Sequence, residues 1–159
     1  MKSEEVDKLV FSAQNKWAEY VIDLGNQNIQ QNEKNKIMNK FLEDLYAFKI
    51  VDVLFKPTKA CIKQFRTSKE DFTSYFIANN NLHKEDKGFA LEPWKKITFE
   101  NFNITKIDRQ ILSMGNYYFE NLNGQTIKVE FTFGYIIDDM GKLLINLHHS
   151  SLPFSKENN

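Results

Sequence analysis

The sequence predicts an α+β fold in which N-terminal helices pack on one face of a conical, curved antiparallel sheet. Three observations predict it. Apolar residues recur at helical spacing in the first half of the chain, and they alternate with polar residues in the second half. Turn-forming Asn, Asp and Gly separate the alternating segments from one another. The length of 159 residues fits one domain, which we expect over residues 1–159.

The first half of the chain predicts helices and one short strand. Helical apolar spacing covers about residues 4–24, and a second helical stripe covers 37–48. The apolar run 50–55 predicts a short buried strand. Thr67 and Glu70 have the spacing of a capping box, so we expect a third helix to begin there.

The second half predicts a meander of antiparallel strands. Alternation of apolar and polar residues indicates strands over about 94–104, 111–119, 127–135 and 142–151. Turns at 121–124 and 138–141 contain Gly with Asn or Asp. A sheet of this kind, rolled around the helices, encloses a conical cavity that can serve as a pocket.

Composition excludes several classes of partner. Lys and Arg total 21 and Asp and Glu total 21, so no net charge attracts nucleic acid or an anionic membrane. No apolar run approaches the ~20 residues that cross a bilayer. The first residues lack the apolar core of a secretory signal, and the single cysteine, Cys61, is typical of a reducing compartment. We therefore expect a cytoplasmic protein that binds neither nucleic acid nor membrane.

The most unusual run is Leu-His-His-Ser-Ser-Leu-Pro, close to the C-terminal end. Side chains of a strand alternate between its faces. Alternation places His149 and Ser151 on one face with the odd-numbered apolar residues of 143–147, and it places His148 and Ser150 on the other. If the apolar face lines the cavity, His149 and Ser151 form a polar pair on an apolar wall, which is typical of a small-molecule site.

Two other interpretations of these residues stay open. Buried histidines are commonly structural, satisfied by hydrogen bonds, or part of an interface. A metal site is less favoured, because a catalytic zinc usually has three protein ligands and adjacent histidines on a strand diverge. The remaining histidine, His83, lies in a polar stretch, and Cys61 has no partner at ligand spacing. No nucleophile elbow and no glycine-rich phosphate loop is present.

Six strings in order carry a resemblance to a known family. They are VLFKPTKA (53–60), QFRTSKEDFTSYF (64–76), EDKGFALEPWKKITFEN (85–101), SMGNYYF (113–119), VEFTFGYIIDD (129–139) and GKLLINLHHSSLP (141–153). Over about residues 45–154 the chain resembles the iota-class carbonic anhydrases. That family has the fold of the association domain of calcium/calmodulin-dependent protein kinase II, in the nuclear transport factor 2-like superfamily.

The resemblance implies a dimeric conical barrel whose cavity interconverts carbon dioxide and bicarbonate. Several members of the family work without a metal and surround bicarbonate with a Thr, a Tyr, a His and a Ser. The strings FKPT and SYF place the Thr at Thr58 and the Tyr at Tyr75. The His and Ser lie two apart in the HHSS run, which leaves two pairs, and strand alternation selects His149 with Ser151.

These residues predict a mechanism. Phe131, Phe133 and Tyr135 would form an aromatic wall for carbon dioxide, and the hydroxyls would donate hydrogen bonds to the developing anion. His149 would accept or relay the proton of the attacking water. We expect no cofactor, with zinc or manganese as the less favoured possibility, and a homodimer. The alternatives are a non-enzymatic association module and a protein that binds another small ligand in the same cavity.

Overall fold

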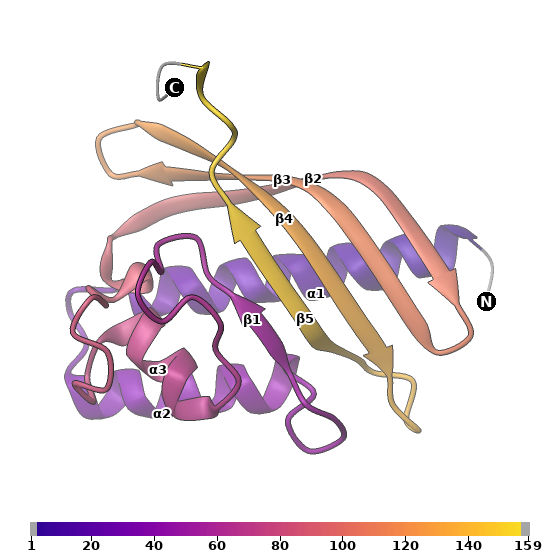
Figure 1. Cartoon of the computed structure of the whole chain (residues 1–159), viewed down its shortest axis with the longest axis horizontal. Coiled ribbons are helices and arrows are strands. Elements are labelled where there is room, and N and C mark those ends of the chain that lie inside the picture. Colours follow the sequence, from indigo (N-terminus) through magenta and orange to yellow (C-terminus); the bar gives the residue numbers. More distant parts are fainter. Residues whose placement is uncertain (1–2, 157–159) are drawn as a thin grey trace.

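The computed structural model describes residues 3–156, so the ends of the predicted domain, 1–2 and 157–159, lie outside the described residues. Figure 1 shows the described chain as helices packed beside a long curved sheet. Its elements are α1 (Ser3–Leu24), α2 (Gln31–Leu45), β1 (Leu54–Lys56), α3 (Lys69–Ile77), the short 3-10 helix η1 (Phe89–Leu91), β2 (Trp94–Ile107), β3 (Gln110–Asn121), β4 (Thr126–Ile137) and β5 (Leu143–Ser151). The predicted α+β class and the order of its elements are confirmed.

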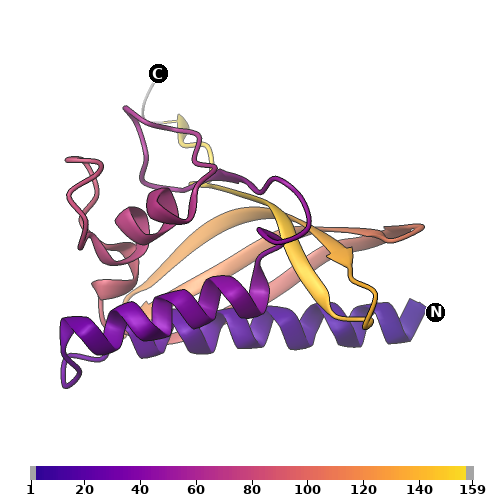
Figure 2. The same cartoon turned by 90° about the horizontal axis from the view of Figure 1, so that it is seen from below.

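The strands form one sheet in the order β1-β5-β4-β3-β2. All neighbours are antiparallel except β1, which pairs with β5 in parallel. Figure 2 shows α1 and α2 side by side beneath the arched strands, so the helices cover a single face of the sheet. Within residues 3–156, no helix is both long and apolar enough to cross a membrane.

Trp17 joins the helices to the sheet. Its side chain is 1% exposed and comes from the middle of α1. Its ring lies about 6 Å from the rings of Phe41 on α2, Phe76 on α3, and Phe99 and Phe133 on the sheet. Most of these pairs meet edge to face, the arrangement that aromatic rings prefer. The buried aromatic residues of the sequence therefore build the core between the two layers.

The predicted strand over residues 50–55 is wrong for its first part. Only Leu54–Lys56 is a strand. The carbonyl of Ala47 accepts hydrogen bonds from the backbone N–H groups of Ile50 and Val51, which closes a turn. Both side chains are exposed, at 48% and 39%, because the turn carries them to the surface.

The predicted capping box is also displaced by one residue. Ser68, and not Thr67, is the N-cap of α3, and its hydroxyl accepts from the Asp71 N–H at 3.1 Å. The Asp71 carboxylate accepts from the N–H groups of both Thr67 and Ser68. Asp71 also contacts His83 Nε2 at 2.6 Å, whereas Glu70 is exposed. This second partner favours the Asp71 box.

Candidate active site

A small cavity lies inside the curve of the sheet, between the β1 loop, α3 and the inner faces of β3 and β5. Its volume is about 10 Å³. Its polar groups are Thr58, Tyr75, Tyr117, His148 and Ser150. The apolar part of its lining is Trp17, Phe55, Pro57, Phe76 and Phe89. An apolar wall with convergent polar groups is typical of a small-molecule site. The volume has room for about one water-sized molecule, so a ligand of this cavity must have few atoms.

The structure turns His148 and Ser150 toward this cavity. His148 is 2% exposed and Ser150 is 1% exposed. His149 is exposed and lies with Ser151 in a shallow depression on the outer face of the sheet. Ser151 Oγ donates there to the Glu130 carboxylate at 3.3 Å. The predicted placement of His149 and Ser151 on the cavity face is therefore wrong.

A bulge in β5 explains this difference. Tyr135 pairs with Ile145, but the next residue of β4, Gly134, pairs with Leu147, so Asn146 is an extra residue in β5. One extra residue moves every later side chain to the opposite face. A Cβ at Gly134 would lie 3.0 Å from Asn146 Oδ1, so the glycine makes room for the bulge. A glycine inside an alternating strand was the signal for it in the sequence.

The His148 ring has a hydrogen-bond partner at each nitrogen. The Tyr46 hydroxyl lies 3.0 Å from Nδ1, and Ser150 Oγ lies 3.1 Å from Nε2. The Tyr117 hydroxyl is 3.4 Å from the same Nε2 and also hydrogen-bonds with Ser150 Oγ. Behind Tyr46, Trp17 Nε1 donates to the phenol oxygen at 3.0 Å. Hydrogen bonds at both ring nitrogens thus fix the orientation of the imidazole at the cavity wall.

Thr58 and Tyr75 meet the cavity from its other side. Thr58 lies on the loop that follows β1, and Tyr75 comes from α3. The Tyr75 hydroxyl accepts from the backbone N–H of Lys59 at 3.3 Å. Thr58 lines the same cavity as Tyr75 and Tyr117, and its side chain partly offsets the rise that burial causes in the pKa of each phenol. Thr58 and Tyr75, predicted from the sequence, therefore lie at one cavity with His148.

The titratable side chains of the cavity are held in their uncharged forms. Burial lowers the pKa of His148 well below its ordinary value, because the imidazolium would lose its hydration. Burial likewise raises the pKa of Tyr75 and of Tyr117 above that of an ordinary phenol. The cavity thus presents O–H and N–H dipoles without a formal charge among these groups.

The predicted aromatic wall lies behind the cavity. Phe133 packs its edge against His148, with ring centroids 4.4 Å apart and an angle of 81°. Phe131 and Tyr135 pack on Phe133 at 5.2 and 5.8 Å. None of these three residues is part of the cavity lining, where Phe55 takes the corresponding place, 4.6 Å from the imidazole.

Sequence reasoning missed three residues of this site: Trp17, Tyr46 and Tyr117. Tyr117 shares the buried face of β3 with Ile111 and Phe119, so alternation along that strand was a usable signal. In the sequence, Trp17 and Tyr46 have the pattern of ordinary core aromatic residues. Only the packing of α1 and α2 under the sheet brings them close to His148.

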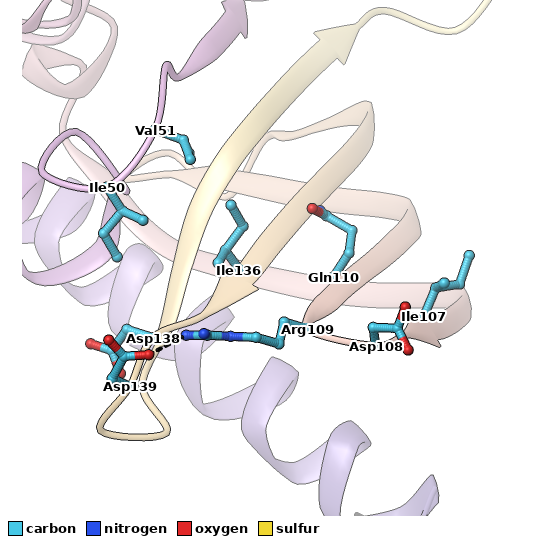
Figure 3. A pocket seen from close by; sticks show the side chains of 9 residues that line it. All are labelled: Ile50, Val51, Ile107, Asp108, Arg109, Gln110, Ile136, Asp138 and Asp139. Atoms are coloured by element: carbon cyan, nitrogen blue, oxygen red, sulfur yellow. Dashed lines mark hydrogen bonds and ion pairs between the residues drawn. The ribbon is translucent and has the colours of Figure 1, made fainter.

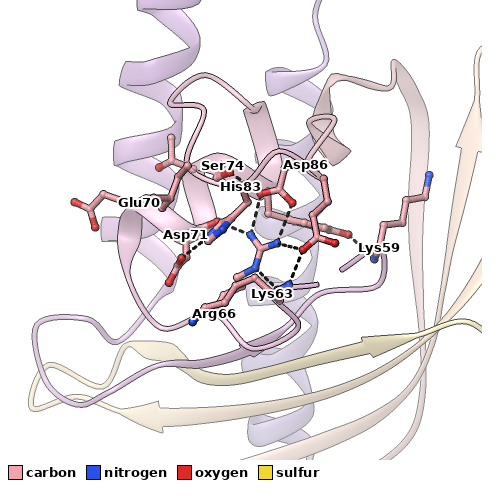
Figure 4. A network of polar contacts seen from close by, with 12 residues as sticks. Lys59, Lys63, Arg66, Glu70, Asp71, Ser74, His83 and Asp86 are labelled. Carbon is pink, nitrogen blue, oxygen red and sulfur yellow. Dashed lines mark hydrogen bonds and ion pairs between the residues drawn. The ribbon is translucent and has the colours of Figure 1, made fainter. Parts of the chain in front are cut away.

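A buried ion-pair network, drawn in Figure 4, connects the loop between β1 and α3 to residues 83–86. The fully buried Arg66 guanidinium makes two bonds to Asp86, at 2.9 and 3.0 Å. The Glu85 carboxylate accepts the backbone N–H groups of residues 61–63, and these bonds lower its pKa to about 2. The network fastens the middle of the loop and its end near α3, the part that follows Thr58 in the chain.

A larger groove of about 590 Å³ lies at the opposite end of β5 and is drawn in Figure 3. Ile50, Val51 and Arg109 are among its lining residues. Arg109 is already paired, with Asp139 at 2.9 Å and with the Ile137 carbonyl. The one cation of the groove lining is thus engaged by Asp139, and the lining contains no histidine, serine or tyrosine. We therefore place the chemistry in the smaller cavity.

The polar side chains of the cavity do not form a metal site. Over residues 3–156, no group of three His, Cys, Asp or Glu side chains is arranged to hold a metal ion. The cavity has one imidazole, and its ring nitrogens already contact Tyr46 and Ser150. Zinc or manganese would usually need more imidazole or carboxylate ligands than this, so the residues present do not fit either ion.

Comparison with known proteins shows the family of this chain. The family model described as metal-independent carbonic anhydrase matches residues 8–152. A metal-independent carbonic anhydrase from Nostoc sp. (strain PCC 7120) is 33% identical over 150 residues, which are 92% of this chain and 73% of that protein.

Solved structures give the same result. The iota-carbonic anhydrase from a cyanobacterium, complexed with bicarbonate, is 32% identical with a TM-score of 0.87, over 94% of this chain and 93% of that one. A structure from Xanthomonas campestris, described as a calcium/calmodulin dependent protein kinase II association domain, shares the fold at 23% identity. Its TM-score is 0.62, over 91% of this chain and 85% of the other. The match over nearly the whole chain shows that this protein belongs to the metal-independent carbonic anhydrase family.

Proposed function

We propose that this chain, a carbonic anhydrase by family, interconverts carbon dioxide and bicarbonate in the cavity of Thr58, Tyr75, His148 and Ser150. The observation that carries the proposal is the convergence of these uncharged polar groups on one small, aromatic-walled cavity. Carbon dioxide is apolar and suits the rings. Bicarbonate is an anion, and preorganised donors stabilise its oxygens as charge develops.

The bulge in β5 decides which histidine and serine we assign. Of the two pairs that the HHSS run offers, only His148 and Ser150 contact the cavity. Tyr117 belongs with them, because its hydroxyl bridges toward both. Phe133 supports the imidazole from behind, and Phe131 and Tyr135 support Phe133 in turn.

We infer that the proton of the attacking water travels through a hydroxyl. A hydroxyl can accept one hydrogen bond while it donates another. The water oxygen bonds to the carbon, its proton passes to the oxygen of Ser150 or Tyr117, and the proton of that hydroxyl passes to an oxygen of carbon dioxide. The product is carbonic acid, which ionises to bicarbonate on release. No side chain has to become charged, in keeping with the burial of these groups.

We propose that the reaction needs no metal, because the cavity offers one imidazole and no carboxylate as metal ligands, and positioning can replace metal activation of water. The test is carbon dioxide hydration by stopped flow after metal stripping, with chelator present. We expect the activity to persist. Complete loss that only zinc or manganese restores would contradict the proposal.

Ser150→Ala and Ser151→Ala make the decisive pair, since the same change is made at neighbouring residues on opposite faces of β5. Removal of one preorganised donor costs about 10²–10³ in kcat, and we expect this loss for Ser150→Ala only. Ser151→Ala should stay within about twofold, because its side chain lies on the outer face. The reverse ranking would show that the outer depression is the active site.

We also propose that the chain forms a homodimer through the outer face of the sheet. No described helix covers that face, as Figure 2 shows, and it exposes Leu112 and Met114 at 39% and 54%. Lys128 and Glu130 add charges of both signs, so two copies can be complementary. Met114→Glu should shift the protein to monomers in analytical ultracentrifugation. Met140→Glu, at a turn residue that is 88% exposed, is the matched control and should change nothing.

The same experiments separate the alternative functions. A non-enzymatic association module would keep its oligomer and hydrate no carbon dioxide above the buffer rate. A protein for larger ligands would need a cavity of about 300–1,000 Å³, far above the volume of this one.

We further propose that the whole chain acts as one domain in the cytoplasm, where a free, exposed Cys61 stays reduced.

A further inference from the structure

A chain of hydrogen bonds with a defined direction reaches His148 from behind the cavity. Trp17 Nε1 lies 3.0 Å from the Tyr46 hydroxyl, which lies 3.0 Å from His148 Nδ1. An indole N–H only donates, so the Tyr46 oxygen is the acceptor of the first bond. The second bond has no direction of its own, because an imidazole nitrogen can donate or accept.

The surroundings of Tyr46 settle that direction. Its side chain is 2% exposed, and the rings of Phe41 and Phe72 pack against it at 5.6 and 4.9 Å. Among residues 3–156, its hydroxyl has two hydrogen-bond partners, Trp17 and His148. If Nδ1 carried a proton, the phenol oxygen would accept two bonds and its own hydrogen would be buried without an acceptor, which is strongly disfavoured. The phenol therefore donates to Nδ1.

We propose that Trp17 and Tyr46 are positioning residues that hold His148 as the tautomer protonated on Nε2, so that its cavity-side nitrogen donates a hydrogen bond and does not act as a general base. This inference rests on the proposed function for its catalytic meaning. The low pKa of the buried imidazole agrees with it, because a neutral ring with a bare Nδ1 must carry its proton on Nε2.

The fixed tautomer orients the next groups as well. Nε2–H points to Ser150 Oγ at 3.1 Å, so that oxygen accepts and its hydrogen is free to donate onward. The Ser150 hydroxyl can then donate to Tyr117 or to an anion oxygen. A neutral site of donors of this kind is suited to bicarbonate, and it leaves proton transfer to the hydroxyls.

The first test is the ¹⁵N NMR spectrum of the whole protein labelled at histidine, at neutral pH. Long-range proton couplings distinguish a protonated ring nitrogen from a bare one, and His148→Asn assigns the signals. We expect a bare Nδ1 and a protonated Nε2 in the unaltered protein. A protonated Nδ1 in the unaltered protein would overturn the inference without any activity measurement.

The second test is Tyr46→Phe, which removes only the hydroxyl, with Tyr20→Phe as the matched control. The Tyr20 hydroxyl bonds to Asp44, and its ring contacts Phe41, not His148. Tyr46→Phe should release the tautomer to a mixture and lower kcat by about tenfold or more, the usual effect of losing the partner that orients a histidine. Tyr20→Phe should change neither quantity.

The outcomes separate the two proposals. If Tyr46→Phe changes the tautomer but leaves kcat intact, the positioning role is wrong. If Tyr46→Phe lowers kcat without any change of tautomer, the inference is also wrong, because the effect is then structural. If the unaltered protein shows the expected tautomer and no hydration activity, the proposed function fails while the tautomer assignment stands.

Discussion

The stability of the protein should depend on pH through His148. The pKa of this buried imidazole lies well below its ordinary value of 6.5 in the folded chain, because burial penalises the charged form. As the pH falls through about 6.5, His148 becomes protonated in the unfolded chain but stays neutral in the folded chain. The contribution of His148 to stability is therefore complete above that pH and is lost below it.

The magnitude follows from linkage. With an unfolded pKa of 6.5 and a folded form that stays neutral, the loss between about pH 7.5 and about pH 5 is about 2 kcal/mol. His149, which is exposed, has a pKa lowered mainly by partial burial and adds to the trend in the same direction.

Urea unfolding at the two pH values measures this loss. His148→Asn should be less stable than the unaltered protein at about pH 7.5, since it loses ring packing, but its stability should fall by about 2 kcal/mol less toward about pH 5. His149→Asn is the matched control and should retain most of the fall. Parallel pH dependences for His148→Asn and the unaltered protein would refute the linkage argument.

Three further predictions concern packing and charge. Asp86→Asn should cost about 3–5 kcal/mol in urea unfolding, because it leaves the fully buried Arg66 guanidinium poorly paired; a cost below about 1 kcal/mol would contradict this account. Gly115→Ala should destabilise by about 1–3 kcal/mol, since its Cβ would lie 2.1 Å from a carbonyl oxygen of β2; an unchanged thermal midpoint would exclude the clash. Phe133→Ala, at a fully buried ring, should cost about 3–5 kcal/mol, whereas Phe154→Ala, at a 76% exposed one, should change stability by less than about 0.5 kcal/mol.

The sequence was sufficient for most elements of this fold, although α2 covers Gln31–Leu45 where helical spacing predicted 37–48. Alternation located β3 and β4 within one or two residues of their ends, and helical spacing located α1 over nearly its whole length. These signals are local, because burial of one face imposes a period on each element separately. The short β1 was misjudged because an apolar run such as 50–55 has no period that separates a strand from a turn.

The candidate site was only partly predictable. Thr58 and Tyr75 followed from strings that resemble the family, and the structure brings both to the cavity. The inward pair on β5 was assigned wrongly, since period-two counting fails at the extra residue, Asn146. Tyr46 lies 102 residues from His148 in the sequence, so no local pattern could have joined them.

The doubled His-His-Ser-Ser run makes the end of β5 tolerant of a slip in register. If β5 kept Asn146 but lost its bulge, so that Asn146 paired with Gly134, His149 and Ser151 would replace His148 and Ser150 at the inner face, and an imidazole and a hydroxyl would still meet there. A one-residue shift of register in this strand would then exchange equivalent side chains instead of abolishing them. The His-His-Ser-Ser run thus gives each face of β5 one imidazole and one hydroxyl, so that either face can present this pair to the cavity.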